Sequence, residues 1–388
     1  MKKYNLQTII YTITTFMLGC NEYMVMGVLS DISKDMKIPV AELGLLVSAF
    51  ALTYAVSTPL ISVFASRFKR HLYLYGLMTI FILGNTASAL APNYALLMIS
   101  RIVTACTSGS IISVCLVMAN YSIPREKRAS AISWIFSGFN IASIAGVPIG
   151  TYISTHSSWR NSFWAIDIIS LIALLALLVF AEKNTPQAKP TKQKVSAFVF
   201  LKDPRVTKWL VITIMMCAAQ FSFYTYIRPI ITQEMNFNNT TLNILLLVLG
   251  AASIIGNKIG GWTADHGGGK VLVKLFALMI VTMIIAGITM RSLPWLSFCL
   301  IAIVCALSAT WGSTVQITML DVASESYPNL MDFASSINPV FSNYGIFVGS
   351  TIASLALPFT GIQYIILLSA VFAIIGQLTV ISINKQNA

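Results

Sequence analysis

Apolar runs of about 20 residues recur along the whole chain, and no other feature of the sequence constrains the fold as strongly. A helix needs a run of about that length to cross the ~30 Å hydrocarbon core of a bilayer. Of the 388 residues, 56% are hydrophobic and only 10% are charged, so a soluble fold would expose too much apolar surface to water. The sequence therefore predicts an all-α membrane protein with no soluble catalytic domain.

Twelve membrane-spanning helices are predicted from these runs, with ends uncertain by about 2–4 residues. The runs lack the period-2 alternation of an outer-membrane barrel and are too long for barrel strands. The first run is also too long for a signal-peptide core, so we expect it to be a retained helix. The expected spans are 6–30, 42–66, 72–91, 95–120, 129–154, 162–181, 209–232, 241–263, 271–291, 294–318, 331–357 and 362–384.

The basic residues predict the orientation of the chain. If the N-terminus is cytoplasmic, 19 of the 25 basic residues fall in inner loops and tails. The positive-inside rule then places both termini in the cytoplasm of a cell (inner) membrane. A basic cytoplasmic face also accounts for the net charge of +12, so no nucleic-acid partner is expected. The six cysteines lie inside spans without CxxC spacing, which predicts neither a metal site nor a disulfide framework.

A polar, basic and proline-containing stretch at 182–208 separates the sixth span from the seventh. We interpret it as a cytoplasmic linker between an N-terminal six-helix bundle at 1–181 and a C-terminal one at 209–388. Two bundles of this kind with weak internal similarity are typical of transporters, whose substrate site lies between the halves. The repeat is visible in the loops after spans two and eight, at residues 65–70 (ASRFKR) and 260–270 (GGWTADHGGGK).

The second of these loops resembles the G-x-x-x-D-[RK]-x-G-x-[RK] loop of the major facilitator superfamily. The first loop departs from that pattern, because Ser66 stands where the acid is expected. The resemblance implies a gating role for residues of both loops, whereas the glycines and proline of segment 146–150 either share that role or only let helices pack closely and bend. These candidates are Arg67, Arg70, Gly146, Pro148, Gly150, Gly261, Asp265, Gly268 and Lys270.

Further motifs extend the resemblance from residue 21 to residue 345. Segment 146–150 (GVPIG) resembles the G-x-P-x-G motif of the drug:proton antiporters, and 101–105 (RIVTA) resembles their R-x-x-x-G element with alanine in place of glycine. Segment 159–163 (WRNSF) is similar to the W-R-x-x-F turn. Segments 21–29, 224–229 and 343–345 resemble a branch of these transporters that exports sugars and purines and confers chloramphenicol resistance. The resemblance implies two six-helix bundles in the major facilitator fold.

Four ionisable residues lie clearly inside the predicted spans, and charges at that depth cost at least ~2.5–3.5 kcal/mol each. Glu22 and Arg101 lie at similar depths on helices of opposite direction, roughly 12 and 10 Å from the outer side at 1.5 Å per residue. An acid beside a fixed cation suits a proton relay, although a static ion pair holding two helices in register is the alternative. Asp167 is either a second proton or substrate contact or a residue of a polar vestibule.

Arg228 stands near the expected end of span seven and either extends to the outer interface or binds an anionic part of the substrate. The remaining candidate substrate contacts are polar residues within spans, for which hydrogen bonding between helices is the default role. They are Asn140, Gln220, Tyr224, Gln316 and Asn343.

These features favour a secondary transporter that exports a small organic molecule (a drug, sugar or related metabolite) in exchange for protons, as in multidrug efflux. An exporter of an anionic or zwitterionic metabolite, such as an opine-type metallophore, is the alternative. A membrane-embedded enzyme or a channel is disfavoured, because the histidines lie in separate loops and no selectivity signature is present. We expect a monomer in the lipid bilayer, with a small-molecule substrate and protons as partners and no cofactor.

Overall fold

The computed structural model describes residues 3–65, 68–183, 197–327 and 330–386. Within these ranges the chain is helical and contains no strand, as the sequence predicted. It divides into two compact units, with residues 1–40 and 49–191 in unit 1 and residues 41–48 and 192–388 in unit 2. Each unit is described by itself below.

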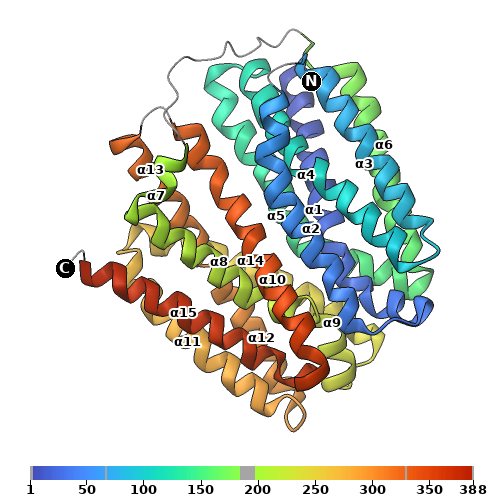
Figure 1. Cartoon of the computed structure of the whole chain (residues 1–388), viewed down its shortest axis with the longest axis vertical. Helices are drawn as coiled ribbons and strands as arrows, with labels where there is room; N and C mark the ends of the chain where they lie inside the picture. Colours follow the sequence, from blue (N-terminus) through green and yellow to red (C-terminus); the bar gives the residue numbers. More distant parts are fainter. Residues whose placement is uncertain (1–2, 66–67, 184–196, 328–329, 387–388) are drawn as a thin grey trace. The chain divides into compact units, whose positions relative to one another are not determined.

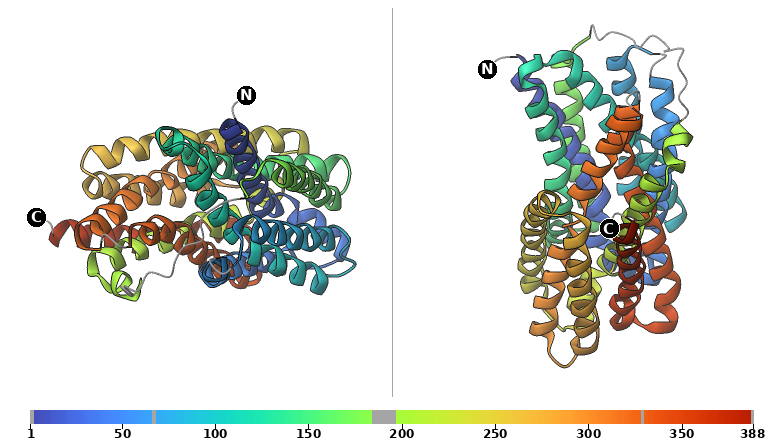
Figure 2. Two further views of the ribbon diagram at one scale, coloured as in Figure 1. Left: turned by 90° about the horizontal axis from the view of Figure 1, so that it is seen from above. Right: turned by 90° about the vertical axis from the view of Figure 1, so that its left-hand side faces the viewer.

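Unit 1 is built from the first six helices, without residues 41–48 at the start of the second, and these helices run side by side in Figure 1. The most extensive packing is between the first and the fifth, which lie together in Figure 2 as well. The third helix packs on the fourth and the sixth. The six are α1 (Lys3–Met36), α2 (Val40–Ala65), α3 (Arg70–Ala89), α4 (Tyr94–Ser122), α5 (Arg125–His156) and α6 (Trp159–Phe180).

Unit 2 contains the remaining elements. The long helix α14 and the last helix α15 both pack on α8, while α11 packs on α12 and α15. The elements are α7 (Ala197–Lys202), α8 (Pro204–Tyr224), α9 (Ile227–Pro229), the π-helix η1 (Ile230–Glu234), α10 (Asn239–Asp265), α11 (Gly269–Thr289), α12 (Pro294–Ser308), α13 (Gly312–Ser326), α14 (Met331–Thr360), the 3-10 helix η3 (Ile362–Tyr364) and α15 (Ile365–Gln386).

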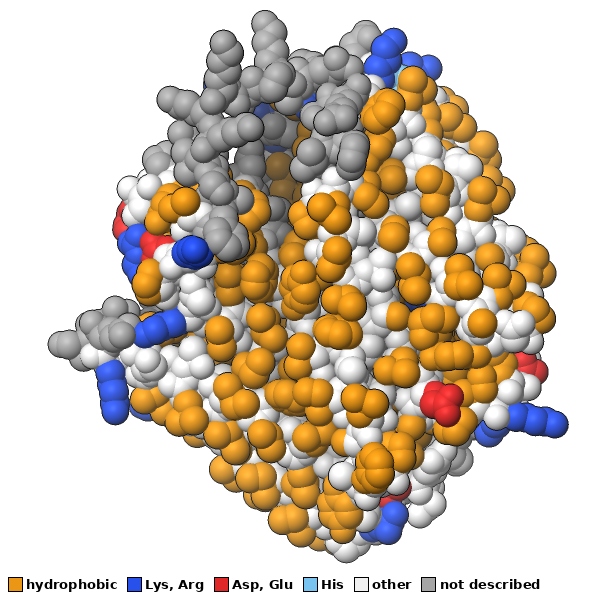
Figure 3. Space-filling model, in the orientation of Figure 1, with side chains coloured by type: hydrophobic (Ala, Val, Ile, Leu, Met, Phe, Trp, Pro, Cys, Tyr) orange, Lys and Arg blue, Asp and Glu red, His pale blue; other side chains and the backbone are white. Residues whose placement is uncertain are grey.

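Eleven helical segments in the described ranges are long and apolar enough to cross a membrane. The 34-residue α1 falls outside that set, because its threonines together with Asn21 and Glu22 reduce its hydropathy. Large hydrophobic side chains that a soluble protein would bury are exposed on these helices. Val179 is 68% exposed and Ile288 is 71% exposed. Hydrophobic side chains are spread over the described part of the face shown in Figure 3, with only a few charged ones among them. The units therefore present the apolar exterior that lipid requires.

Two predicted spans of unit 2 are interrupted in the structure, which corrects the expectation of continuous helices at 209–232 and 294–318. The first ends at Tyr224 and resumes at Ile227. Pro229 has no N–H to donate to the carbonyl of Thr225 four residues earlier, which explains a break there. The second stops at Ser308 and resumes at Gly312, where the Thr310 hydroxyl bonds to the Leu307 carbonyl (2.7 Å) and competes with the backbone.

Close helix crossings in both units depend on glycine pairs four residues apart. On α5, a Cβ added to Gly150 would lie 3.0 Å from the Met24 carbonyl, whereas one on Gly146 would meet its nearest atom at 3.3 Å. On α14, a Cβ on Gly345 would lie 2.5 Å from the Ile214 carbonyl and one on Gly349 would lie 2.7 Å from the Ala218 Cα. The pairs let α5 approach α1 and α14 approach α8 backbone to backbone.

The W-R-x-x-F turn joins three parts of unit 1 through one acid at the end of α1. Asp35 accepts hydrogen bonds from Arg160 Nη1 (2.5 Å) and from Trp159 Nε1 (3.1 Å). Arg160 also donates to the carbonyl of Ala91 between α3 and α4 (3.0 Å). The hydrogen bond from Arg160 holds the pKa of the Asp35 carboxyl below its usual range. This turn fixes α6 against the ends of α1 and α3.

Candidate functional site

One centre of buried charge in unit 1 is formed around Arg101, whose side chain is fully enclosed. Its Nη1 donates to the backbone carbonyl of Asn21 (3.0 Å) and to the Asn21 Oδ1 (3.1 Å). The guanidinium also lies over the ring of Phe50, with Cζ 4.3 Å from the ring centroid, a favourable arrangement for a desolvated cation. Arg101 of α4 is thus held by α1 on one side and by α2 on the other.

Glu22 follows Asn21 on α1 and is 5% exposed. It interacts electrostatically with Arg101, so the structure brings together the two charges that the sequence placed at equal depth. Among the described residues the two side chains form no direct ion pair, because the hydrogen bonds of Arg101 go to Asn21. This departs from the simple static salt bridge considered from the sequence.

Several polar atoms at this centre are buried without a hydrogen-bond partner in the described chain. They are Glu22 Oε2, Asn21 Nδ2, and Arg101 Nε and Nη2. Native proteins satisfy most buried polar atoms, so a group of unsatisfied ones marks a site with another task than stability. Here the carboxylate oxygen can take up a proton, and the N–H donors can bind water or an acceptor group of a substrate.

Two aromatic residues of this centre were missed by the sequence analysis. Phe50 and Tyr54, one helical turn apart on α2, form a buried cluster with Ala105 of α4. Their four-residue spacing places them on one face of the second span. Aromatic pairs with this spacing also occur on faces that contact lipid, so the spacing alone did not mark them. Only the tertiary structure shows that this face is the one that covers Arg101.

Asp167 lies in a different polar cluster, between α3 and α6. Its Oδ1 accepts from Asn85 Nδ2 (3.0 Å) and its Oδ2 accepts from the Thr86 hydroxyl (2.7 Å). Asn85 also donates to the carbonyl of Phe163 (2.9 Å). The carboxyl of Asp167 is therefore partnered on both oxygens, unlike that of Glu22. Asn140 of α5, the other candidate in this unit, has an exposed side chain.

The candidates of unit 2 are spread over several helices. Arg228 is 4% exposed and lies directly after the break between α8 and α9, so it does not extend into an exposed position. Tyr224, the last residue of α8, is also buried and meets Phe221 and Phe223 edge-on. Gln220, one turn before Tyr224, is half-buried.

The two remaining amides lie further along unit 2. Asn343 of α14 is 4% exposed, and its Nδ2 donates to the carbonyl of Pro339 (3.2 Å), whereas its Oδ1 has no partner in the described ranges. Gln316 of α13 accepts a long hydrogen bond from Asn338 (3.5 Å). Arg228 follows Tyr224 by four residues along the chain, on the other side of the break, and these candidates of unit 2 lie on α8, α9, α13 and α14.

The gating candidates lie at helix ends and crossings. Gly267 and Gly268 have φ angles of +98° and +40°, so the loop between α10 and α11 turns where only glycine is unstrained. Asp265, the last residue of α10, and Lys270 are exposed, and Gly261 faces open space. Arg70 lies over the ring of Tyr121 (4.8 Å). Pro148 lies inside the continuous α5, and Arg67 lies outside the described residues.

Comparison with known proteins agrees with this geometry. The sequence profile of the Major Facilitator Superfamily matches residues 11–350. The chain is 31% identical to the inner membrane transport protein YdhP of Escherichia coli O157:H7, over 90% of this chain and 88% of that protein. It is 28% identical to a chloramphenicol resistance protein of Streptomyces lividans over 68% of each chain.

The fold is also similar to a solved structure, that of a D-xylose–proton symporter. The TM-score is 0.77 at 15% identity, with 96% of each chain covered. The relatives and the structural neighbour are transporters and not enzymes. By its sequence and its two helical bundles, the chain is a multi-pass transporter of the major facilitator superfamily.

Proposed function

We propose that this transporter exports a small organic molecule in exchange for protons, with Glu22 as the coupling carboxylate. The observation that carries the proposal is the buried Glu22, whose Oε2 lacks a hydrogen-bond partner and which interacts with Arg101. A buried carboxyl group that is held near a cation and left unpaired can take up and release a proton as its surroundings change. The resistance protein of Streptomyces lividans among the relatives supports efflux of a drug-like molecule.

The orientation and location follow from the same proposal. We place the chain in the cell membrane with both termini in the cytoplasm, because basic residues gather in the loops on the side of the N-terminus. Substrate and protons then exchange across the membrane in opposite directions. A monomer suffices, since each chain contains both bundles.

The test is transport into inverted membrane vesicles with an imposed pH gradient. Glu22→Gln keeps the shape of the side chain and removes its proton exchange, so gradient-driven uptake should fall to background while substrate exchange partly persists. Asp167→Asn is the matched control, since that carboxyl is already bonded by Asn85 and Thr86. Full gradient-driven uptake by Glu22→Gln would refute the assignment, and its selective loss in Asp167→Asn would transfer the role to Asp167, as the sequence also allowed.

A second candidate, export of an anionic or zwitterionic metabolite, rests on Arg228. Its burial just after a helix break supports binding of a carboxylate better than it supports an anchor at the membrane interface. Arg228→Ala should then weaken binding of anionic compounds and spare neutral ones. Equal binding of both classes by wild type and variant would leave the neutral-drug substrate as the better assignment.

A further inference from the structure

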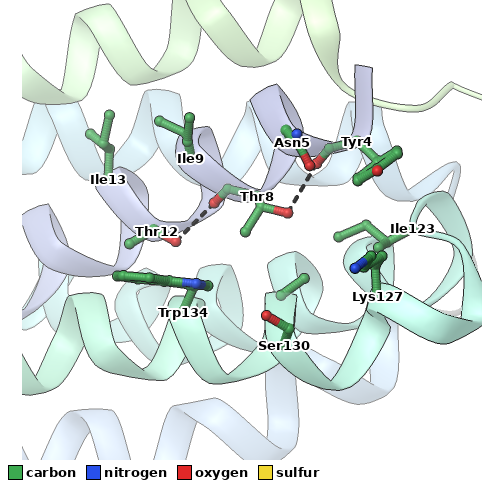
Figure 4. Close-up of a pocket in the computed structure, with 11 residues that line it drawn as sticks. Tyr4, Asn5, Thr8, Ile9, Thr12, Ile13, Ile123, Lys127, Ser130 and Trp134 are labelled. Atoms are coloured by element: carbon green, nitrogen blue, oxygen red, sulfur yellow. Dashed lines mark hydrogen bonds between the residues drawn. The ribbon is translucent and has the colours of Figure 1, made fainter. Parts of the chain in front are cut away.

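A groove of about 620 Å³ lies in unit 1, far along α1 from the Glu22 centre. It runs between the first turns of α1 and those of α5, next to the end of α4 at Ile123 (Figure 4). None of its lining residues belongs to the centre around Arg101. The transport proposal therefore leaves this groove without a task.

One end of the groove is polar and cationic. Tyr4 and Asn5 of α1 lie there opposite Lys127 of α5, with Ser130 one turn further along (Figure 4). The ammonium of Lys127 and the hydroxyl of Ser130 have no partner among the described residues. Lys127 also lies in the basic segment 125–128, which contains a single acid, Glu126. The free donors at this end suit an anionic group.

The other end is apolar and open. Trp134 is 58% exposed, and Ile9 and Ile13 are 44% and 41% exposed. The threonines between the two ends use their hydroxyl protons within α1, since Thr8 donates to the Tyr4 carbonyl (2.9 Å) and Thr12 to the Thr8 carbonyl (2.8 Å). This end therefore offers apolar surface to its occupant and few donors.

We propose that the groove binds one anionic phospholipid, with its phosphate against Lys127 and Ser130 and the start of an acyl chain along Ile9, Ile13 and Trp134. Basic pockets between membrane helices close to the headgroup level attract anionic lipids, and tryptophan and tyrosine favour that level. A water-soluble anion would use only the polar end and leave the apolar end uncovered. The change from cationic to apolar along one groove matches a lipid molecule.

The experiment measures lipid binding to the purified full-length protein by native mass spectrometry. Phosphatidylglycerol is the anionic probe, phosphatidylethanolamine the zwitterionic one and inorganic phosphate the free anion. Lys127→Gln should weaken phosphatidylglycerol binding about fivefold, as expected for one basic residue near a membrane surface. Lys69→Gln removes a charge from an exposed position of the same unit outside the groove and should leave binding unchanged.

Trp134→Ala tests the apolar end. It should weaken binding of both lipids, because it removes contact with the chain rather than with the headgroup. Equal phosphatidylglycerol binding by wild type and Lys127→Gln would overturn the proposal, as would an equal loss in Lys69→Gln. Displacement of the lipid by millimolar inorganic phosphate would assign the polar end to a free anion instead. Thermal midpoints of the three variants equal to that of the wild type exclude misfolding as the cause of a loss.

Discussion

The first and fourth spans of unit 1 differ from those of unit 2 in the continuity of their helices and in the buried charges they contain. In unit 1 these spans, α1 and α4, are continuous over 34 and 29 residues, and they hold Glu22 and Arg101. In unit 2 the corresponding spans are broken, after Tyr224 and after Ser308. Arg228 is the one buried charged residue that the described part of unit 2 contains.

The difference teaches how the tasks of the transporter can be divided. Buried charges need rigid surroundings, because a small displacement would expose or separate them at high cost. Broken helices have free backbone groups and bend at low cost. Under the proposed proton exchange, the buried charges of unit 1 would carry the proton and the broken helices of unit 2 would allow bending. The predictions below test this division, from the largest expected effect to the smallest.

Removing Arg101 from unit 1 and removing Arg228 from unit 2 should have different consequences. Arg101→Ala leaves Glu22 and Asn21 without the cation that organises them, so pH-driven transport should fall by about a hundredfold, equivalent to ~2.7 kcal/mol. Arg228→Ala should keep the coupling to the pH gradient and change only substrate affinity. Transport assays at several pH gradients measure both. Equal loss of coupling in the two variants would break the division between units.

Restoring the backbone donor at the first break should slow the transporter. Pro229→Ala provides an N–H for the Thr225 carbonyl, so α8 and α9 should join and the protein should become slightly more stable. The maximal transport rate should fall by roughly tenfold, since conformational steps often set turnover. Pro148→Ala in the continuous α5 is the control in unit 1, and its effect on the rate should be smaller. A faster Pro229→Ala variant would contradict a role of the break in turnover.

The glycine pairs allow a sharper comparison of packing. Alanine at Gly345 or Gly349 would press on backbone atoms of α8, and alanine at Gly150 on the Met24 carbonyl of α1. Overpacking of this kind costs about 1–3 kcal/mol. Gly146→Ala meets its nearest atoms at 3.3 and 3.4 Å and should cost least. Thermal midpoints in detergent give the order, and a larger loss for Gly146→Ala than for Gly345→Ala would contradict it.

The smallest effect concerns the start of unit 2. Asp203 accepts hydrogen bonds from the Arg205 N–H (2.9 Å) and Nη2 (2.8 Å), and the side-chain bond holds the pKa of Asp203 below its usual range. This stabilisation is therefore present at neutral pH and is lost as the pH falls below about 4. Asp203→Asn should lower stability at pH 7 by less than ~1 kcal/mol, because Arg205 is half-exposed.

The difference between Asp203→Asn and wild type should shrink as the pH approaches the range where the wild-type carboxyl is itself protonated. Thermal unfolding from pH 7 down to about pH 2 measures this, because the difference should stay constant down to about pH 4 and shrink only below it. A difference that stays constant to the acid end of that range would show that shape and not charge explains the loss. Asparagine remains a good helix N-cap, so the cap itself is preserved in this comparison.

The sequence predicted the helical membrane fold well, because each apolar run carries its own signal in about 20 residues. It also predicted that Glu22 and Arg101 lie buried inside the bundle, since charges inside apolar runs are rare. It did not predict that Asn21 would take the hydrogen bonds of Arg101, which depends on the rotation of α1 against α4. Nor did it predict the break after Ser308. No proline lies there, and the break depends on the hydroxyl of Thr310 and on the glycine at which the helix resumes, Gly312.

The sequence does contain a signal for the break after Tyr224, but a hydropathy profile does not detect it. Pro229 interrupts the hydrogen bonds of a helix without changing how apolar the run is, so a window that measures only hydropathy passes over it. The burial of Arg228 follows from that break, because the chain turns before the side chain could reach the end of the span. Tertiary structure was needed for both.

The short helix α7 has a practical consequence for dividing the protein into separate pieces. Phe200 is fully buried against Tyr327 (ring centroids 5.5 Å apart) and Phe333 (6.1 Å), so α7 belongs to unit 2 by its packing. A gene split placed between Lys183 and Ala197 would leave this aromatic contact intact in the second fragment. A split placed after Lys202 would remove Phe200 and expose the surface around Tyr327. Co-expressed halves cut at the earlier position are therefore the better starting point for reassembly or for inserting a reporter domain.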